Sequence, residues 1–191
     1  MRSTTAALLL LLLMAASACS SPEDDVRHSV EAFTAAATYK DTEALFRLHV
    51  DSEGQGVLCD AKFSALWDKA AADRTAAHCT EAAEVVAMAP EQRQSLDAAV
   101  VLLSEILDFQ CRNPSAPCRD FAEELFHRRA KGSRLLTRDI KRVTVTRVDV
   151  VAPGEATAYV DVAYEGNPTV DRISLYLTER QGRWLFKTYP W

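Results

Sequence analysis

The residue with the clearest chemical context in this chain is Cys19, a thiol that directly follows the small residues Ala16-Ser17-Ala18. Ahead of them stand one basic residue, Arg2, and an uncharged, mostly apolar run from Ala6 to Ala16. This order of charge, apolar run and small residues is that of a secretory signal peptide. The run is too short to cross a bilayer, which takes about 20 apolar residues. The sequence therefore predicts an exported protein from which residues 1–18 are removed.

The cleavage region around Cys19 also resembles the lipobox of bacterial lipoproteins, although Ala16 stands where leucine is most common. The resemblance implies that the Cys19 sulfur receives a diacylglyceryl group and that the residue becomes the N-terminus, with three fatty acyl chains such as palmitate. Several acyl chains give stable membrane attachment. Residues 19–25 would then be a lipidated polar tether to the cell envelope, at the outer membrane if the organism is Gram-negative. The alternative is an ordinary secretory signal followed by an incidental cysteine.

Four further cysteines offer disulfide or metal chemistry: Cys59, Cys79, Cys111 and Cys118. An even number of cysteines in an exported chain indicates disulfide bonds. Of the three possible connectivities, closeness in sequence favours Cys59–Cys79 and Cys111–Cys118, the second pair flanking a proline-rich loop. A metal site that also uses His78 and His127 is the alternative, but the spacings fit no common zinc motif. We therefore predict disulfides, no metal and no cofactor.

Size and charge limit the function classes open to the mature chain. The full sequence has 191 residues and a formal net charge of −5. Removing 18 residues leaves enough chain for one domain with a real core. The acidic balance and the export signal both argue against binding to nucleic acid. We expect one domain over residues 26–191.

Apolar periodicity divides this domain into helices followed by strands. Spacings of three and four residues predict a helix over 26–37 and a short helix capped by Asp41, then a polar loop at 51–56. Further helices follow over about 57–132, which we interpret as a helical insert. The clearest of them begins at Pro90 and carries a broad apolar stripe that includes Val100 and Leu103, a pattern typical of core.

From Ile140 onward the apolar period changes from 3.6 to 2, which predicts strands. A change of phase after Val145 indicates a bulge near Arg147. Turns at Pro153-Gly154, Gly166-Asn167 and Gln181-Gly182 separate four strands, the last of which is expected to end at Trp191. The predicted fold class is α+β, with N-terminal helices packed on a C-terminal four-stranded antiparallel meander.

Two parts of this pattern resemble the NTF2-like (cystatin-like cone) superfamily, including its small bacterial lipoproteins. Residues 26–33 and 39–45 are similar to the paired opening helices, with Asp41-Thr42-Glu43-Ala44-Leu45 at the second. Residues 156–162, 173–177 and 181–185 are similar to the closing hairpins, with a Gly-x-Trp turn. Together they cover about half of the mature chain, and residues 57–132 depart from the usual core of that fold.

The resemblance implies a curved sheet that can enclose a pocket, for which we name Tyr159, Tyr164 and Tyr176. We expect a membrane-anchored, non-catalytic binding or accessory module for an envelope protein or a small apolar ligand. One alternative is a structural or assembly subunit that docks through residues 61–74. Another is an isomerase- or dehydratase-like enzyme, for which the acid, base and donor candidates are Asp41, His49, Asp161 and the three tyrosines. The chain lacks a nucleophile elbow, a phosphate loop and a catalytic triad signature, which favours binding.

Overall fold

The structure is a computed structural model that describes residues 21–54 and 56–187. The predicted signal peptide and lipidated Cys19 therefore lie outside the described residues, as does the predicted strand end at Trp191. The helical elements are α2 (Pro22–Thr38), α3 (Thr42–Arg47), η1 (Val50–Glu53), η2 (Val57–Cys59), α4 (Ala61–Ala72), α5 (Ala76–Ala87), α6 (Pro90–Arg93), α7 (Ala98–Arg112), α8 (Cys118–Ala130) and α9 (Arg134–Thr137). The strands are β1 (Ile140–Ala152), β2 (Glu155–Tyr164), β3 (Val170–Arg180) and β4 (Arg183–Phe186).

The first helix begins earlier than expected, so the predicted tether over residues 19–25 is wrong from Ser21 onward. Ser21 is the N-cap of α2: its side chain accepts from the Asp24 backbone N–H, and the Asp24 carboxylate accepts from Ser21 in return. Pro22 occupies the first turn together with acidic residues, both of which suit a helix N-terminus. Hydrogen bonds from Ser21 hold the pKa of Asp24 below its usual range.

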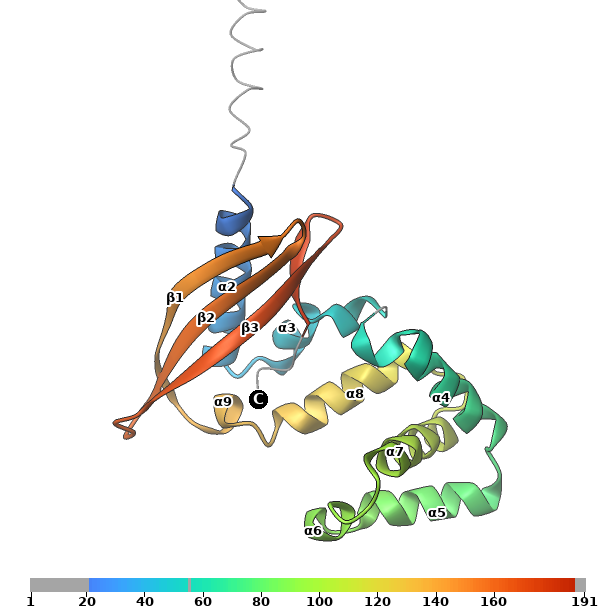
Figure 1. The fold of residues 1–191 in the computed structure, drawn as a ribbon. Helices are drawn as coiled ribbons and strands as arrows, with labels where there is room; N and C mark the ends of the chain where they lie inside the picture. Colours follow the sequence, from blue (N-terminus) through green and yellow to red (C-terminus); the bar gives the residue numbers. More distant parts are fainter. Residues whose placement is uncertain (1–20, 55, 188–191) are drawn as a thin grey trace, which may run out of the picture.

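The C-terminal part is the predicted antiparallel meander, and the α+β class is confirmed. The four strands lie in the order β1-β2-β3-β4 (Figure 1). The β1–β2 pairing shifts register between Val145 and Arg147, where the change of phase predicts a bulge. Gly154, Gly166 and Gly182 have positive φ at the three turns, a conformation that glycine adopts without strain. Of the last strand, the structure describes β4 up to Phe186.

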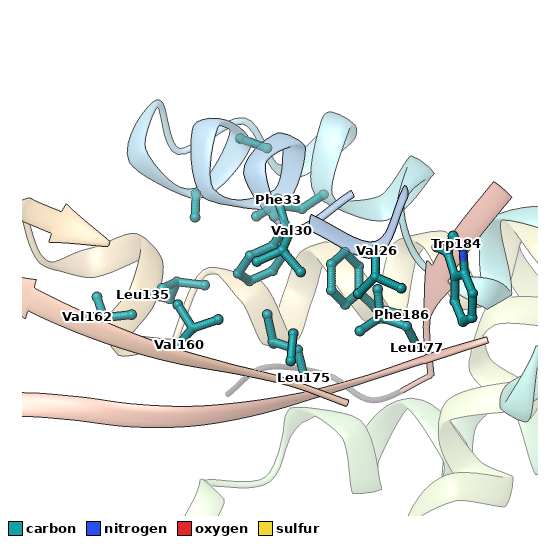
Figure 2. Packing of buried hydrophobic residues seen from close by; sticks show 14 of the residues in the cluster. Val26, Val30, Phe33, Leu135, Val160, Val162, Leu175, Leu177, Trp184 and Phe186 are labelled. Atoms are coloured by element: carbon teal, nitrogen blue, oxygen red, sulfur yellow. The ribbon is translucent and has the colours of Figure 1, made fainter. Parts of the chain in front are cut away.

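The inner face of the sheet is covered by α2 and filled with side chains. Val26, Val30 and Phe33 of α2 point at the sheet and meet Val160 and Leu175 from its strands (Figure 2). Phe186 of β4 lies with its ring centroid 4.9 Å from that of Phe33. The space that an open cone would leave for a ligand is thus occupied here by the protein's own core.

The predicted helical insert has a core of its own. Its buried residues are Phe63, Ala70, Ala82, Ile106, Leu107, Phe109, Phe121 and Leu125. The helix α8 joins the two cores, because Phe121 and Leu125 face the insert while Phe126 and Ala130 belong to the core under the sheet. In Figure 1 the insert extends away from the sheet.

All four cysteines of the described chain form disulfides, as predicted, but the favoured pairing is wrong. The bonds are Cys59–Cys118 and Cys79–Cys111, with sequence separations of 59 and 32. The packing of helical elements decides the pairing, because η2 lies against α8 and α5 lies against α7. Each bond therefore joins elements that touch in the fold rather than neighbours along the chain. With all four thiols oxidised, the cysteine-based metal site is excluded.

Candidate functional site

The three tyrosines named for a pocket do not form one, because they lie on opposite faces of the sheet. Tyr164 is on the inner face and is 2 % exposed. Tyr159 pairs with Ser174 across the β2–β3 ladder, which places it on the outer face together with Tyr176. The Arg147 guanidinium lies 4.2 Å from the centre of the Tyr159 ring, and Tyr176 is 49 % exposed. The alternation of strand residues separates these side chains by the thickness of the sheet.

Tyr164 belongs to the core, with its ring beneath the Arg138 guanidinium at 5.9 Å. Burial raises the pKa of its hydroxyl, and the nearby Asp171 carboxylate adds to that shift. Burial favours the neutral form of the phenol, because the charged form would lack solvation by water. The residue thus stabilises the sheet as an uncharged side chain.

The remaining acid–base candidates are also placed apart from one another. Asp41 caps α3 by accepting from the Ala44 backbone N–H at 2.9 Å, as the sequence suggests. Asp161 lies on the outer face of the sheet, 4.0 Å from Arg172. It lines an open depression of about 430 Å³ that it shares with Tyr159 and Arg147. Among the described residues, no acid or histidine from this set meets a tyrosine in a closed pocket.

A buried polar pair that was not predicted from the sequence lies just before the insert. The Asp51 carboxylate is 3.3 Å from Nδ1 of His49, and the two side chains are 0 % and 2 % exposed. Asp51 also accepts from the Leu58 backbone N–H at 3.1 Å, so it holds the segment that the sequence predicts as a polar loop. A Cβ on Gly56 would overlap the Asp51 carboxylate, which explains a glycine at this point. Both side chains are buried, and the contacts of Asp51 fix the backbone around it.

Glu43, Glu123 and His127 are the one group within the described ranges whose donor atoms lie close enough for a metal ion. Nε2 of His127 is 3.7 Å from Glu43 and 3.9 Å from Glu123. The second oxygen of Glu43 accepts from Arg47 at 3.0 Å. These contacts form an ion-pair cluster between α3 and α8 when His127 is protonated.

The feature best suited to hold a ligand is a groove between α5 and α7, to which the C-terminal end of α4 also contributes. It has a volume of about 380 Å³, within the range of small-molecule sites. We call it the α5–α7 groove, and its lining residues are Ala70, Asp73, His78, Glu81, Ala82, Val85, Val100, Leu103, Ser104 and Leu107. Ala70, Ala82 and Leu107 are buried and form its floor.

A helix break that was not predicted from the sequence precedes α7, one of the two helices of the groove. We predict one helix running from Pro90 through Leu107, whereas the chain forms α6 and α7 with a turn between them. The Asp97 side chain accepts from the Ala99 backbone N–H at 2.7 Å and begins α7 anew. An N-cap aspartate is the signal that could have located this break.

Apolar side chains on α7 that the sequence assigns to the core are partly exposed here. Val100 is 49 % exposed, and Leu103 is half-buried at the groove. Apolar residues also run without interruption over 85–90 and 98–103, at the adjoining ends of α5 and α7. Exposed apolar residues gathered in one place mark binding sites more often than scattered ones do.

A disulfide and ion pairs hold the walls of the groove in place. Cys79 on α5 is bonded to Cys111 on α7. Arg112 of α7 donates to Glu124 of α8 at 3.0 Å, and Arg128 donates to the same carboxylate at 2.7 Å. Burial acts to raise the Glu124 pKa, but these two guanidinium groups outweigh it and the pKa is lowered. Walls that are already held in place lose little conformational entropy when a ligand binds.

A second depression, of about 970 Å³, lies on the other side of α7 and is more open. Arg93 and Glu105 line it and lie 3.9 Å apart, and Glu105 also accepts from Arg128. One of its walls is the four-residue helix α6. The α5–α7 groove is the better-formed site, because two long, cross-linked helices make its walls.

No protein-family model, curated protein or solved structure matches this chain.

Two structural facts bear on location. The two disulfides are typical of proteins in oxidising compartments, outside the cytosol. Over the residues that the structure describes, no helix is both long and apolar enough to cross a membrane.

Proposed function

We propose that this protein is a membrane-anchored lipoprotein of the bacterial cell envelope that binds a small apolar ligand without transforming it. The α5–α7 groove is the observation that carries the proposal, since it combines an apolar floor, a small-molecule volume and a cross-linked frame. The signal-like residues before Cys19 support the anchor. The disulfides agree with an exported location.

An anchor at Cys19 would leave the groove exposed to the aqueous compartment. The chain enters the described fold at the first turn of α2, which lies at the opposite end of the molecule from α6 (Figure 1). Lipid chains just before α2 would therefore hold the insert away from the bilayer.

We further propose that the body is an NTF2-like domain in which binding has moved from the cone to the insert. The paired helices α2 and α3 precede the meander, in the order that the resemblance implies. Aromatic residues such as Phe33 and Phe186 fill the inner face of the sheet. A ligand site on the insert is compatible with this filled core.

Replacing Cys19 with alanine is expected to release the protein from the membrane. Without the sulfur no thioether to diacylglycerol can form, and the acyl chains that stabilise attachment are lost. Membrane fractionation and intact-mass measurement of the processed chain provide the test. The wild-type chain should be membrane-bound and carry the added mass of its acyl groups. An unmodified wild-type N-terminus would refute the anchor.

The groove can be tested with a neutral apolar fluorophore, N-phenyl-1-naphthylamine, whose emission rises in an apolar site. We would use the Cys19→Ala protein, which retains every described residue and avoids competition from lipid. Val100→Glu places a charge at the groove and should weaken binding about ten-fold or more, since burying a valine contributes about 1.5–3 kcal/mol.

Val170→Glu is the matched control, because Val170 on β3 is 45 % exposed against 49 % for Val100. This control should bind the fluorophore as the parent protein does. Equal binding by the two variants, or no binding by the parent, would rule out the groove as the site.

The alternative is an assembly subunit that docks on a partner through residues 61–74. Deleting these residues would not test it. Phe63 and Ala70 of α4 are buried in the core of the insert. Deleting this segment would remove part of that core and unfold the insert, whether or not it docks on a partner.

A further inference from the structure

We infer that the α5–α7 groove selects ligands that join a short apolar chain to a cationic group, such as an alkylammonium ion. The inference rests on the proposed binding function and adds the charge and length of the ligand. It depends on the distribution of polar side chains along the groove.

The charged residues of the groove lie at one end of it and have one sign. Asp73, at the C-terminus of α4, and Glu81, on α5, are carboxylates, and no lysine or arginine lines the groove. The end of α4 meets the beginning of α5 here. The partial negative charge of the first helix end and the partial positive charge of the second offset each other. The side-chain charges therefore decide the electrostatic potential. A cation is therefore attracted to this end.

Two other polar side chains nearby make hydrogen bonds to backbone carbonyl oxygens. His78 places Nδ1 2.7 Å from the Asp73 carbonyl oxygen, so a proton on Nδ1 is used in that hydrogen bond. The guanidinium of Arg74, the next residue after Asp73, donates instead to the carbonyl oxygens of Gln110 and Pro114. With His78 neutral, the carboxylates of Asp73 and Glu81 outnumber the single guanidinium of Arg74, which leaves a net negative charge at this end of the groove.

The rest of the groove is apolar and short. Ala82, Val85, Leu103 and Leu107 line it beyond Glu81. Along α5 the whole lining, with its acidic end, extends from His78 to Val85, which is eight residues or about 10 Å of helix. This length suits a linear ligand of roughly eight carbons together with its charged group, whereas a bound helix would need a longer contact surface.

The experiment compares three ligands with the same octyl chain: octylammonium, 1-octanol and octyl sulfate. Each would displace N-phenyl-1-naphthylamine from the Cys19→Ala protein. We expect octylammonium to bind about ten-fold more tightly than octyl sulfate, with octanol between them. Raising the salt concentration from about 0.05 M to about 0.5 M should reduce this preference, because the charges are partly exposed.

The double variant Asp73→Asn, Glu81→Gln should bring the three affinities to within about two-fold while octanol still binds. Glu84→Gln is the matched control, since Glu84 lies on α5 outside the lining and should leave the preference unchanged.

Three results would overturn the inference. If the parent protein binds the three probes equally, the cation preference is absent but the binding groove stands. If none of the probes binds, the proposed function fails as well. If a lysine-flanked leucine-rich peptide binds and octylammonium does not, the groove is a protein interface instead.

Discussion

Replacing Phe121 with alanine lowers the free energy of unfolding by about 4 kcal/mol, the expected cost of removing a fully buried phenylalanine. Phe121 is 0 % exposed, and its ring centroid lies 5.4 Å from that of Phe109 and 5.9 Å from those of Phe63 and Trp67. Aromatic pairs of this kind contribute beyond the area that they bury. Urea unfolding followed by circular dichroism measures the loss.

Tyr39→Ala is the control for this prediction, because Tyr39 is an aromatic residue that is 83 % exposed at the end of α2. It should change stability by less than about 0.5 kcal/mol. Since α8 contributes to both cores, we also expect the Phe121→Ala protein to unfold in a single transition. A loss below about 1.5 kcal/mol would mean that Phe121 is not the centre of the insert core.

Replacing both Cys59 and Cys118 with alanine is expected to cost about 4 kcal/mol. The bond closes a loop of 59 residues, and the chain-entropy model assigns roughly that value to a loop of this size. It ties η2, at the beginning of the insert, to the first residue of α8. The free energy of unfolding and hydrogen exchange across α8 measure the effect.

Replacing Cys79 and Cys111 provides the comparison, because their loop is shorter and they join α5 to α7. This change should destabilise the protein slightly less and should also weaken binding in the groove, which the Cys59–Cys118 variant should spare. Peptide mapping that found Cys59 bonded to Cys79 would refute the connectivity on which both predictions depend.

The sheet could be predicted from sequence in detail because its signals are local. Alternation of apolar residues identified all four strands, and the change of phase between Val145 and Arg147 located the bulge. Turn residues such as Pro153-Gly154 act within a few positions of themselves. The cap at Asp41 is equally local and was correctly predicted.

Features set by long-range packing could not be predicted in this way. Cys59 bonds to Cys118 because η2 lies against α8, which no spacing reveals. The buried position of Asp51 depends on a partner seven residues away, Leu58. The prediction that the three tyrosines line one pocket was wrong for a simpler reason. Tyr159 and Tyr164 are an odd number of positions apart, so the alternation of strand residues puts them on opposite faces.

The groove was missed because periodicity shows which residues are apolar but not what covers them. The stripe that includes Val100 and Leu103 is that of a core helix. In the fold, α5 covers only part of it, and the beginning of α7 stays accessible. One buried helix face needs apolar residues only at every third or fourth position. The unbroken apolar runs at 85–90 and 98–103 were therefore the available signal.

The most direct test of the account is methyl NMR of the Cys19→Ala protein during titration with octylammonium. We predict that the methyl signals of Val85, Val100 and Leu103 shift, while those of Val160 and Leu175 under the sheet stay in place. Shifts at Val160 and Leu175, or only at Val101 and Leu102 on the other side of α7, would contradict it.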